Sequence, residues 1–231
     1  WSYDDVLPFF KKIENYQGEI TELRSSEGPL KISEVVDRNP IYDGLFKGAD
    51  EIGIPTNKDY NGDEQEGISY TQTTIFKGER MSAEVAYLKP IRSRKNLKII
   101  TNSLVTKLLF EGKTCVGVKV KNKNKIQDYF SQNEVILCGG AINSPQILEL
   151  SGIGNRSILE EKGISLVHEL KGVGENLRDH LGPRLVYNIT KRGISYNDKA
   201  RGINLIKQVL AYAFKRRGFL TLPSAPVLGF F

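Results

Sequence analysis

The run from Val135 to Gly154, VILCGGAINSPQILELSGIG, is the sequence feature that most restricts how this chain of 231 residues can fold. It begins with three apolar residues typical of a strand covered on both faces, and it ends in a pattern typical of a helix. Between them lie Gly139 and Gly140, which have no Cβ, so the backbone can turn sharply and another group can approach closely. The run therefore predicts a strand, a tight turn and a helix in direct succession.

The start of that helix has a chemical consequence. Ser144 is predicted as the N-cap and Pro145 as the first helical residue, because each residue type is favoured at that position. The free N–H groups and partial positive charge at a helix start favour an anion such as a pyrophosphate. A purely structural strand, turn and helix would show the same residues, and the glycine spacing is not the GxGxxG of the usual dinucleotide fingerprint.

Composition excludes several classes of protein. Hydrophobic residues make up 39% and charged residues 26% of the chain, which is ordinary for a globular protein. No stretch reaches the roughly 18 consecutive apolar residues that a membrane span needs. The two cysteines and two histidines show no metal-ligand spacing. We therefore expect neither a membrane span nor a metal site.

The net charge of +6 is mildly basic, and two runs carry much of it. A solvated surface is the favoured interpretation of both runs, and an anionic partner is the alternative. Aromatic residues do not interleave with either run, so no nucleic-acid partner is expected. The runs consist of Lys119, Lys121, Lys123 and Lys125 at period two, and of Lys215, Arg216 and Arg217.

Strand and helix patterns alternate along the chain without an internal repeat, which favours an α/β or mixed α+β fold. Helices are expected at 2–15, 40–53, 82–90, 144–151, 155–162 and 204–217. Strands are expected at 69–76, 97–100, 105–110, 115–120, 129–137 and 182–189. Residues 111–114 have the composition of a hairpin turn between two of these strands.

Several phrases resemble one known family. GGAINSPQILELSGIG is similar to the second signature of the glucose–methanol–choline oxidoreductases, and GVGENLRDH, residues 172–180, is similar to the phrase that follows it there. Residues 1–10, 80–88 and 96–106 also resemble segments of that family. The similar segments cover nearly the whole chain and occur in the same order as in the family. Their sequences are most similar to those of insect-type members.

The resemblance implies part of an FAD-binding Rossmann-like domain, interleaved with a substrate domain made of an antiparallel sheet and helices. Residues 94–180 match the FAD-binding domain. Residues 1–93 are expected to belong mainly to the substrate domain, together with the incomplete segment 181–231.

Individual site residues follow from the same resemblance. Val105 matches the family residue whose main chain meets the adenine of FAD. Gly139, Gly140 and Ala141 match the segment that runs beside the ADP part of FAD. By pattern alone, Val105 would look the same as an ordinary strand valine. A structural role is favoured over catalysis for Asn176, Asp179 and His180.

The family's chemistry implies oxidation of a CH–OH group of an alcohol or sugar by hydride transfer to FAD. The first FAD fingerprint is expected before Trp1 and the catalytic histidine after Phe231, because neither His168 nor His180 matches it. The chain is therefore interpreted as the central part of an FAD-dependent dehydrogenase or oxidase. Its catalytic residues are unknown from this sequence, as are its substrate and its electron acceptor, oxygen or a quinone.

Two other functions remain open. One is a non-catalytic binding or structural protein that retains the same fold. The other is an NAD-dependent reductase, which the absent GxGxxG fingerprint disfavours. Sequons at Asn155 and Asn188 are compatible with a secreted protein and leave the cellular location open.

Overall fold

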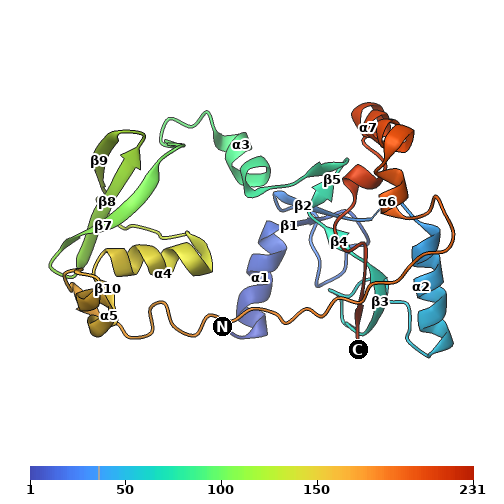
Figure 1. The fold of residues 1–231 in the computed structure, drawn as a ribbon, viewed down its shortest axis with the longest axis horizontal. Helices are drawn as coiled ribbons and strands as arrows, with labels where there is room; N and C mark the ends of the chain where they lie inside the picture. The colour runs from blue at the N-terminus through green and yellow to red at the C-terminus, as the bar shows by residue number, and fades with distance from the viewer. Residues whose placement is uncertain (36) are drawn as a thin grey trace. The chain divides into compact units, whose positions relative to one another are not determined.

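The computed structural model describes residues 1–35 and 37–231, which divide into two compact units. Unit 1 joins residues 1–97 to residues 186–231, and unit 2 is the continuous segment 98–185. Figure 1 shows that both units mix helices and strands. The division by itself does not decide which unit binds substrate and which binds cofactor, so the predicted roles stay predictions.

Unit 1 consists of short strands in small sheets, with helices around them. Its sheets have the strand orders β1-β2-β4, β5-β6 and β12-β3. Its strands are β1 (Glu14–Tyr16), β2 (Leu30–Glu34), β3 (Gly67–Tyr70), β4 (Gln72–Thr73), β5 (Ile75–Phe76), β6 (Glu79–Arg80) and β12 (Val227–Phe230). Its helices are α1 (Tyr3–Ile13), α2 (Pro40–Glu51), α3 (Lys89–Ile91), α6 (Tyr196–Lys199) and α7 (Gly202–Lys215), with a π-helix at Glu84–Leu88 and a 3₁₀ turn at Phe219–Thr221.

The predicted starts of the first two helices are confirmed, and side chains fix both of them. Ser2 caps α1: the Asp5 N–H donates to Ser2 Oγ (3.3 Å), and the Ser2 N–H donates to Asp5 Oδ2 (2.9 Å). Asn39 caps α2, and its amide also donates to the backbone oxygen of Ile194 (2.9 Å). That bond links the two chain segments of unit 1.

A buried arginine organises the centre of unit 1. Arg24 is only 3% exposed, and its guanidinium lies 3.6 Å from the ring centroid of Tyr16. It makes two hydrogen bonds to the carboxylate of Glu14, Nε to Oε2 at 3.1 Å and Nη2 to Oε1 at 2.6 Å. A third bond joins Nη1 to Oδ1 of Asp59 at 2.5 Å. Since every charge in this cluster is paired, the network holds two loops against β1.

Tyr16 connects the arginine cluster to the neighbouring strands. Its hydroxyl donates to Glu34 Oε1 (3.4 Å) and accepts from Nε2 of Gln72 (3.2 Å). Burial, followed by the negative charges of Asp59 and Glu34, raises the pKa of Tyr16 to about 12. The phenol is therefore neutral in the folded protein at any pH near neutrality.

Unit 2 contains a three-stranded antiparallel sheet of order β7-β8-β9, against which a helix packs. No helix in the described parts of either unit is long and apolar enough to cross a membrane. The elements of unit 2 are β7 (Leu104–Glu111), β8 (Thr114–Asn122), β9 (Lys125–Phe130), α4 (Gly140–Leu150), β10 (Ile153–Gly154), α5 (Arg156–Glu161) and β11 (His168–Glu169). The predicted hairpin turn at 111–114 is confirmed, because it joins β7 to β8.

A serine hydroxyl joins α4 to the sheet. Ser151 is fully buried at the end of α4. Its Oγ accepts a hydrogen bond from the Leu108 N–H of β7 (2.8 Å) and donates one to the Ile147 oxygen of α4 (2.5 Å). The buried apolar residues of unit 2 are Leu108, Val120, Leu159 and Val173. The C-terminal end of α4 is thereby fixed against β7.

Three strand predictions are wrong in whole or in part. The strand expected at 129–137 ends at Phe130, and the segments 97–100 and 182–189 form no strand. Each backbone group of a strand needs a hydrogen-bonding neighbour, and within the described residues no strand pairs with residues 97–100, 132–137 or 182–189. The side chain of Ile136 is accordingly 74% exposed.

Two further segments differ from the prediction in detail. The strand expected at 69–76 is divided among β3, β4 and β5. Pro90 was predicted to end the helix that begins near Ser82, but the helix continues to Ile91. The turn before it is a π-turn, in which the Lys89 N–H donates to Glu84 O, five residues earlier. This wider turn accommodates the proline ring, which clashes with the carbonyl four residues back in an α-helix.

Replacement of the buried arginine should destabilise unit 1. The change Arg24→Met leaves the partly buried carboxylates of Glu14 and Asp59 without a counter-charge, and we expect a loss of up to about 3–5 kcal/mol in the free energy of unfolding. Arg156→Met is the matched control, because Arg156 is about half exposed in its ion pairs. The control should change stability by less than about 1 kcal/mol. Equal effects in urea unfolding would contradict the assigned role of Arg24.

Tyr16 should make stability fall at alkaline pH. The unfolded chain loses the phenol proton near pH 10, whereas the folded chain keeps it up to about pH 12. Stability from this group is therefore complete below pH 10 and is lost as the pH rises from 10 to 12. By pH 11 the loss is about 1 kcal/mol, and Tyr16→Phe should remove it. The measurement is urea unfolding at pH 8 and pH 11, with the exposed Tyr3→Phe as control. An unchanged pH dependence in Tyr16→Phe would refute the assignment.

Candidate functional site

The candidate site lies at the N-terminal end of α4. The helix begins at Gly140 with Gly139 as its N-cap, so the prediction of Ser144 as N-cap and Pro145 as first helical residue is wrong. Pro145 lies in the second turn, where it has no N–H to donate to Ala141 O and its ring crowds that carbonyl. Ser144 instead fills the space beside Gly139: its Oγ lies 3.1 Å from the position that a Cβ on Gly139 would occupy.

The backbone at Gly140 is both unusual and open. Its φ of +83° is one that residues with a Cβ rarely adopt, and no atom lies within 4 Å of the place where a Cβ would stand. No side chain among the described residues caps α4, and its first turn contains no acidic residue. The first amide groups of α4 are therefore left without an internal partner.

These features fit the diphosphate of a nucleotide cofactor. Gly140 and Ala141 are exposed, and the side chain of Ile142 is 72% exposed. An open helix N-terminus offers unpaired N–H groups and a partial positive charge, and both stabilise a phosphate group. The residues present at Gly139–Ala141 are thus suited to hold the ADP part of FAD, the role implied by the resemblance. The role itself stays a prediction.

Val105 lies on the neighbouring strand, near the start of β7. It pairs with Val120 of β8, and a register shift follows between Val105 and Lys107. β7 is an edge of its sheet, so the backbone groups on its outer side can meet another molecule, except for the Leu108 N–H, which donates to Ser151. The structure places Val105 and Gly139–Ala141 on two elements in contact, β7 and α4. The contact of Val105 with adenine stays a prediction.

Two residues that the sequence analysis did not select position this site. One is Ser151. The sequence feature that could have identified it is a single hydroxyl residue within the largely apolar run LELSGIG. The other is Glu149, whose carboxylate lies 2.9 Å from where a Cβ on Gly174 would stand. The side chain of Glu149 therefore packs against Gly174, which belongs to the segment 172–180.

The remaining candidates do not form a catalytic cluster. Asn176 has the positive φ of +56° that asparagine tolerates, and Asp179 Oδ1 accepts from the backbone N–H of His180 (2.7 Å). These three residues and His168 are exposed. Within residues 1–35 and 37–231 no group of three potential metal ligands occurs.

Sequence comparisons match the chain to one family. The model for GMC oxidoreductase covers residues 1–182. Human mitochondrial choline dehydrogenase is 42% identical over 78% of this chain and 30% of its own length. An alcohol dehydrogenase [acceptor] of Pseudomonas putida is 38% identical over 100% of this chain and 42% of its own. The chain thus spans less than half of these relatives.

Solved structures agree and confirm the predicted mixed α/β fold. An FAD-dependent oxidoreductase from Chaetomium thermophilum has a TM-score of 0.85 at 27% identity, over 96% of this chain and 41% of its own. A formate oxidase variant of Aspergillus oryzae RIB40 has a TM-score of 0.86 at 26% identity, over 100% of this chain and 41% of its own.

A methyl group at Gly140 should weaken retention of the cofactor. Gly140→Ala places a Cβ in the open space before α4 and strains the backbone by about 1–2 kcal/mol. Gly163→Ala is the matched control, because Gly163 has φ +67° and equally open surroundings but lies after α5. In the intact protein we expect FAD affinity about tenfold lower for Gly140→Ala, as for one lost bond to a charged group.

The flavin absorbance of the purified protein and its melting temperature measure the two effects separately. Both variants should lower the melting temperature by similar amounts in the absence of added FAD. Equal flavin retention by the two variants would argue against a cofactor role for Gly140.

Proposed function

The chain belongs to the GMC oxidoreductase family, whose members bind FAD, and we propose that the intact protein oxidises the CH–OH group of an alcohol or sugar. The observation that best supports this proposal is the open, uncapped N-terminus of α4 behind the two glycines. A helix N-terminus of this kind can bind a phosphate group. The diphosphate of FAD is the part of the cofactor that such a terminus would bind.

We assign the two units different tasks. Unit 2 holds the ADP part of FAD through the amides at Gly140–Ala141 and through the free edge of β7 near Val105. Ser151 fixes α4 to β7, so these two contact surfaces keep a constant separation while the cofactor is bound. Unit 1 supplies part of the substrate domain, and the paired charges around Arg24 make that part rigid.

The chemistry is divided between cofactor and protein. Bound FAD supplies the acceptor for the hydride that leaves the alcohol carbon, and the alcohol hydroxyl gives up a proton as the carbonyl forms. A base that takes this proton is expected outside residues 1–231. His168 lies on β11 and His180 in an exposed segment, and neither matches the catalytic position of the family.

The substrate is proposed only as a class. The relatives named above are a choline dehydrogenase and an alcohol dehydrogenase, which makes small alcohols the first compounds to test. Sugars belong to the same chemical class of CH–OH donors. The similarity to insect-type members stays a prediction, and so does the choice between oxygen and a quinone as electron acceptor.

Anaerobic reduction of the flavin tests the proposal. The intact protein is purified and mixed without oxygen with choline, a primary aliphatic alcohol, an aryl alcohol or glucose. We expect at least one of them to bleach the visible absorbance of the flavin, with one carbonyl formed for each flavin reduced. The methyl ether of the active alcohol is the control, because it has no hydroxyl proton to lose and should leave the flavin oxidised.

Two results would count against the proposal. A purified protein without flavin would indicate a non-catalytic protein that has kept the fold. A flavin-containing protein that no CH–OH compound reduces, yet which dithionite reduces, would exclude this reaction class.

A further inference from the structure

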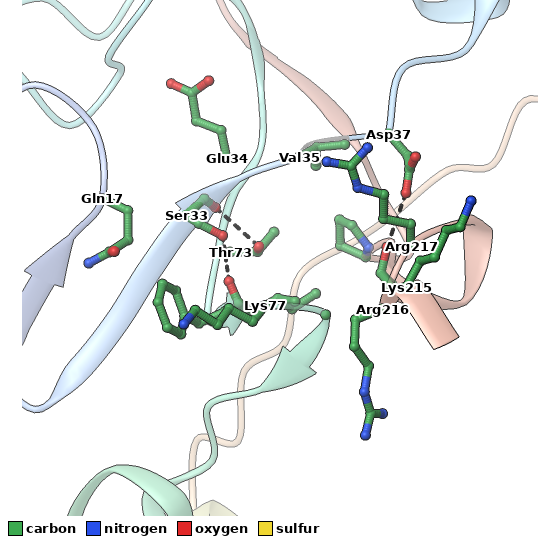
Figure 2. Close-up of a pocket in the computed structure, with 15 residues that line it drawn as sticks. Gln17, Ser33, Glu34, Val35, Asp37, Thr73, Lys77, Lys215, Arg216 and Arg217 are labelled. Atoms are coloured by element: carbon green, nitrogen blue, oxygen red, sulfur yellow. Dashed lines mark hydrogen bonds between the residues drawn. The ribbon is translucent and has the colours of Figure 1, made fainter. Parts of the chain in front are cut away.

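A cavity of about 510 Å³ lies within unit 1, and none of its lining residues belongs to unit 2, which contains the cofactor-binding segment (Figure 2). One wall is formed by β2 and β5, and the other by the C-terminal end of α7 with the turn that follows it. The β5–β6 turn at Lys77 and Gly78 closes one side. A volume of this size is enough for a small organic molecule or ion.

The carboxylates of this cavity already have partners. Asp37 Oδ2 accepts from the backbone N–H of Gly218 (2.7 Å), and Oγ1 of Thr221 lies 3.4 Å from it. Glu34 accepts from the Tyr16 hydroxyl and lies 4.0 Å from Arg38. Arg38 offsets the charge of Glu34, whereas the N–H that donates to Asp37 is neutral, so the negative charge of Asp37 remains and offsets one of the lining cations.

Four cationic side chains line the same cavity, and only one of them is paired. Arg216 forms an ion pair with Glu79 (3.1 Å). For Lys77, Lys215 and Arg217, no carboxylate of residues 1–35 and 37–231 lies within 4.0 Å. Figure 2 shows Arg216 extending away from Asp37, whereas Arg217 turns back beside Val35. Lys77, Lys215 and Arg217 together outnumber the one remaining carboxylate charge, that of Asp37, so the cavity carries a net positive charge.

We propose that this cavity binds a small oxyanion with two negative charges, a phosphate or a dicarboxylate, held chiefly by Lys77 and Arg217. The planar guanidinium of Arg217 can donate two parallel hydrogen bonds to such a group, and Lys77 adds a compact charge from the β5–β6 turn. Lys215 strengthens the local positive potential. The nearby hydroxyl of Thr221 already donates to Gly218 O. Binding of the anion therefore depends on the cationic side chains.

A simpler role for the basic run predicts a different result. Cations in the last turn of a helix interact favourably with its carbonyl end, and α7 ends at Lys215. That role needs no ligand and does not involve Lys77, which lies on the β5–β6 turn. Binding that depends on both Lys77 and Arg217 separates the two roles.

Calorimetric titration of the intact, flavin-loaded protein tests the site, because bound flavin already occupies the diphosphate position. Inorganic phosphate and succinate are titrated separately at constant ionic strength. The parent should bind one of them at millimolar or lower concentration. The double variant Lys77→Ala/Arg217→Ala should bind that anion about tenfold or more weakly. Lys207→Ala is the matched control, because it removes a charge from the exposed face of α7 and should bind as the parent does.

The choice of anion identifies the source: a response to phosphate only indicates a phosphorylated ligand, and a response to succinate only indicates an organic acid. Absence of binding in the parent would overturn the proposal. Equal affinity in the parent and the double variant would do the same, as would an equal loss in Lys207→Ala. Circular dichroism of each variant shows that any loss does not arise from unfolding.

Discussion

The position of the candidate cofactor site depends on one buried hydroxyl. Ser151 Oγ bonds to Leu108 of β7 and to Ile147 of α4, so the helix cannot slide along the strand without breaking a buried hydrogen bond. Leaving such a group without a partner costs about 1–3 kcal/mol. The joint therefore fixes where the opposite end of α4, with its open amide groups, lies in relation to the edge of β7.

Much of the local structure could be predicted from the sequence, because local chemistry decides it. Ser2 and Asn39 cap their helices, and residues 111–114 form the expected hairpin turn. The paired glycines also lie at the start of a helix, with Gly139 as its N-cap and Gly140 as its first residue. In each case a few adjacent residues determine the backbone, and no distant partner is needed.

The failed predictions share a different physical cause. Residues 131–137 and 182–189 have strand composition, yet a strand requires a neighbour, and composition does not reveal whether one is present. At α4, capping preference favoured Ser144, but the backbone freedom of Gly139 and Gly140 allowed the helix to begin earlier. The Arg24 cluster could not be foreseen either, because it joins residues 10 to 35 positions apart.

The central claim is that the first amides of α4 hold the diphosphate of FAD. Hydrogen exchange at the amides of residues 140–143 tests it most directly, in the intact protein before and after removal of the flavin. The account predicts that these amides exchange slowly with FAD bound and much faster without it, while the amides at the Ser151 end change little. Equal exchange at residues 140–143 in both states would contradict the claim.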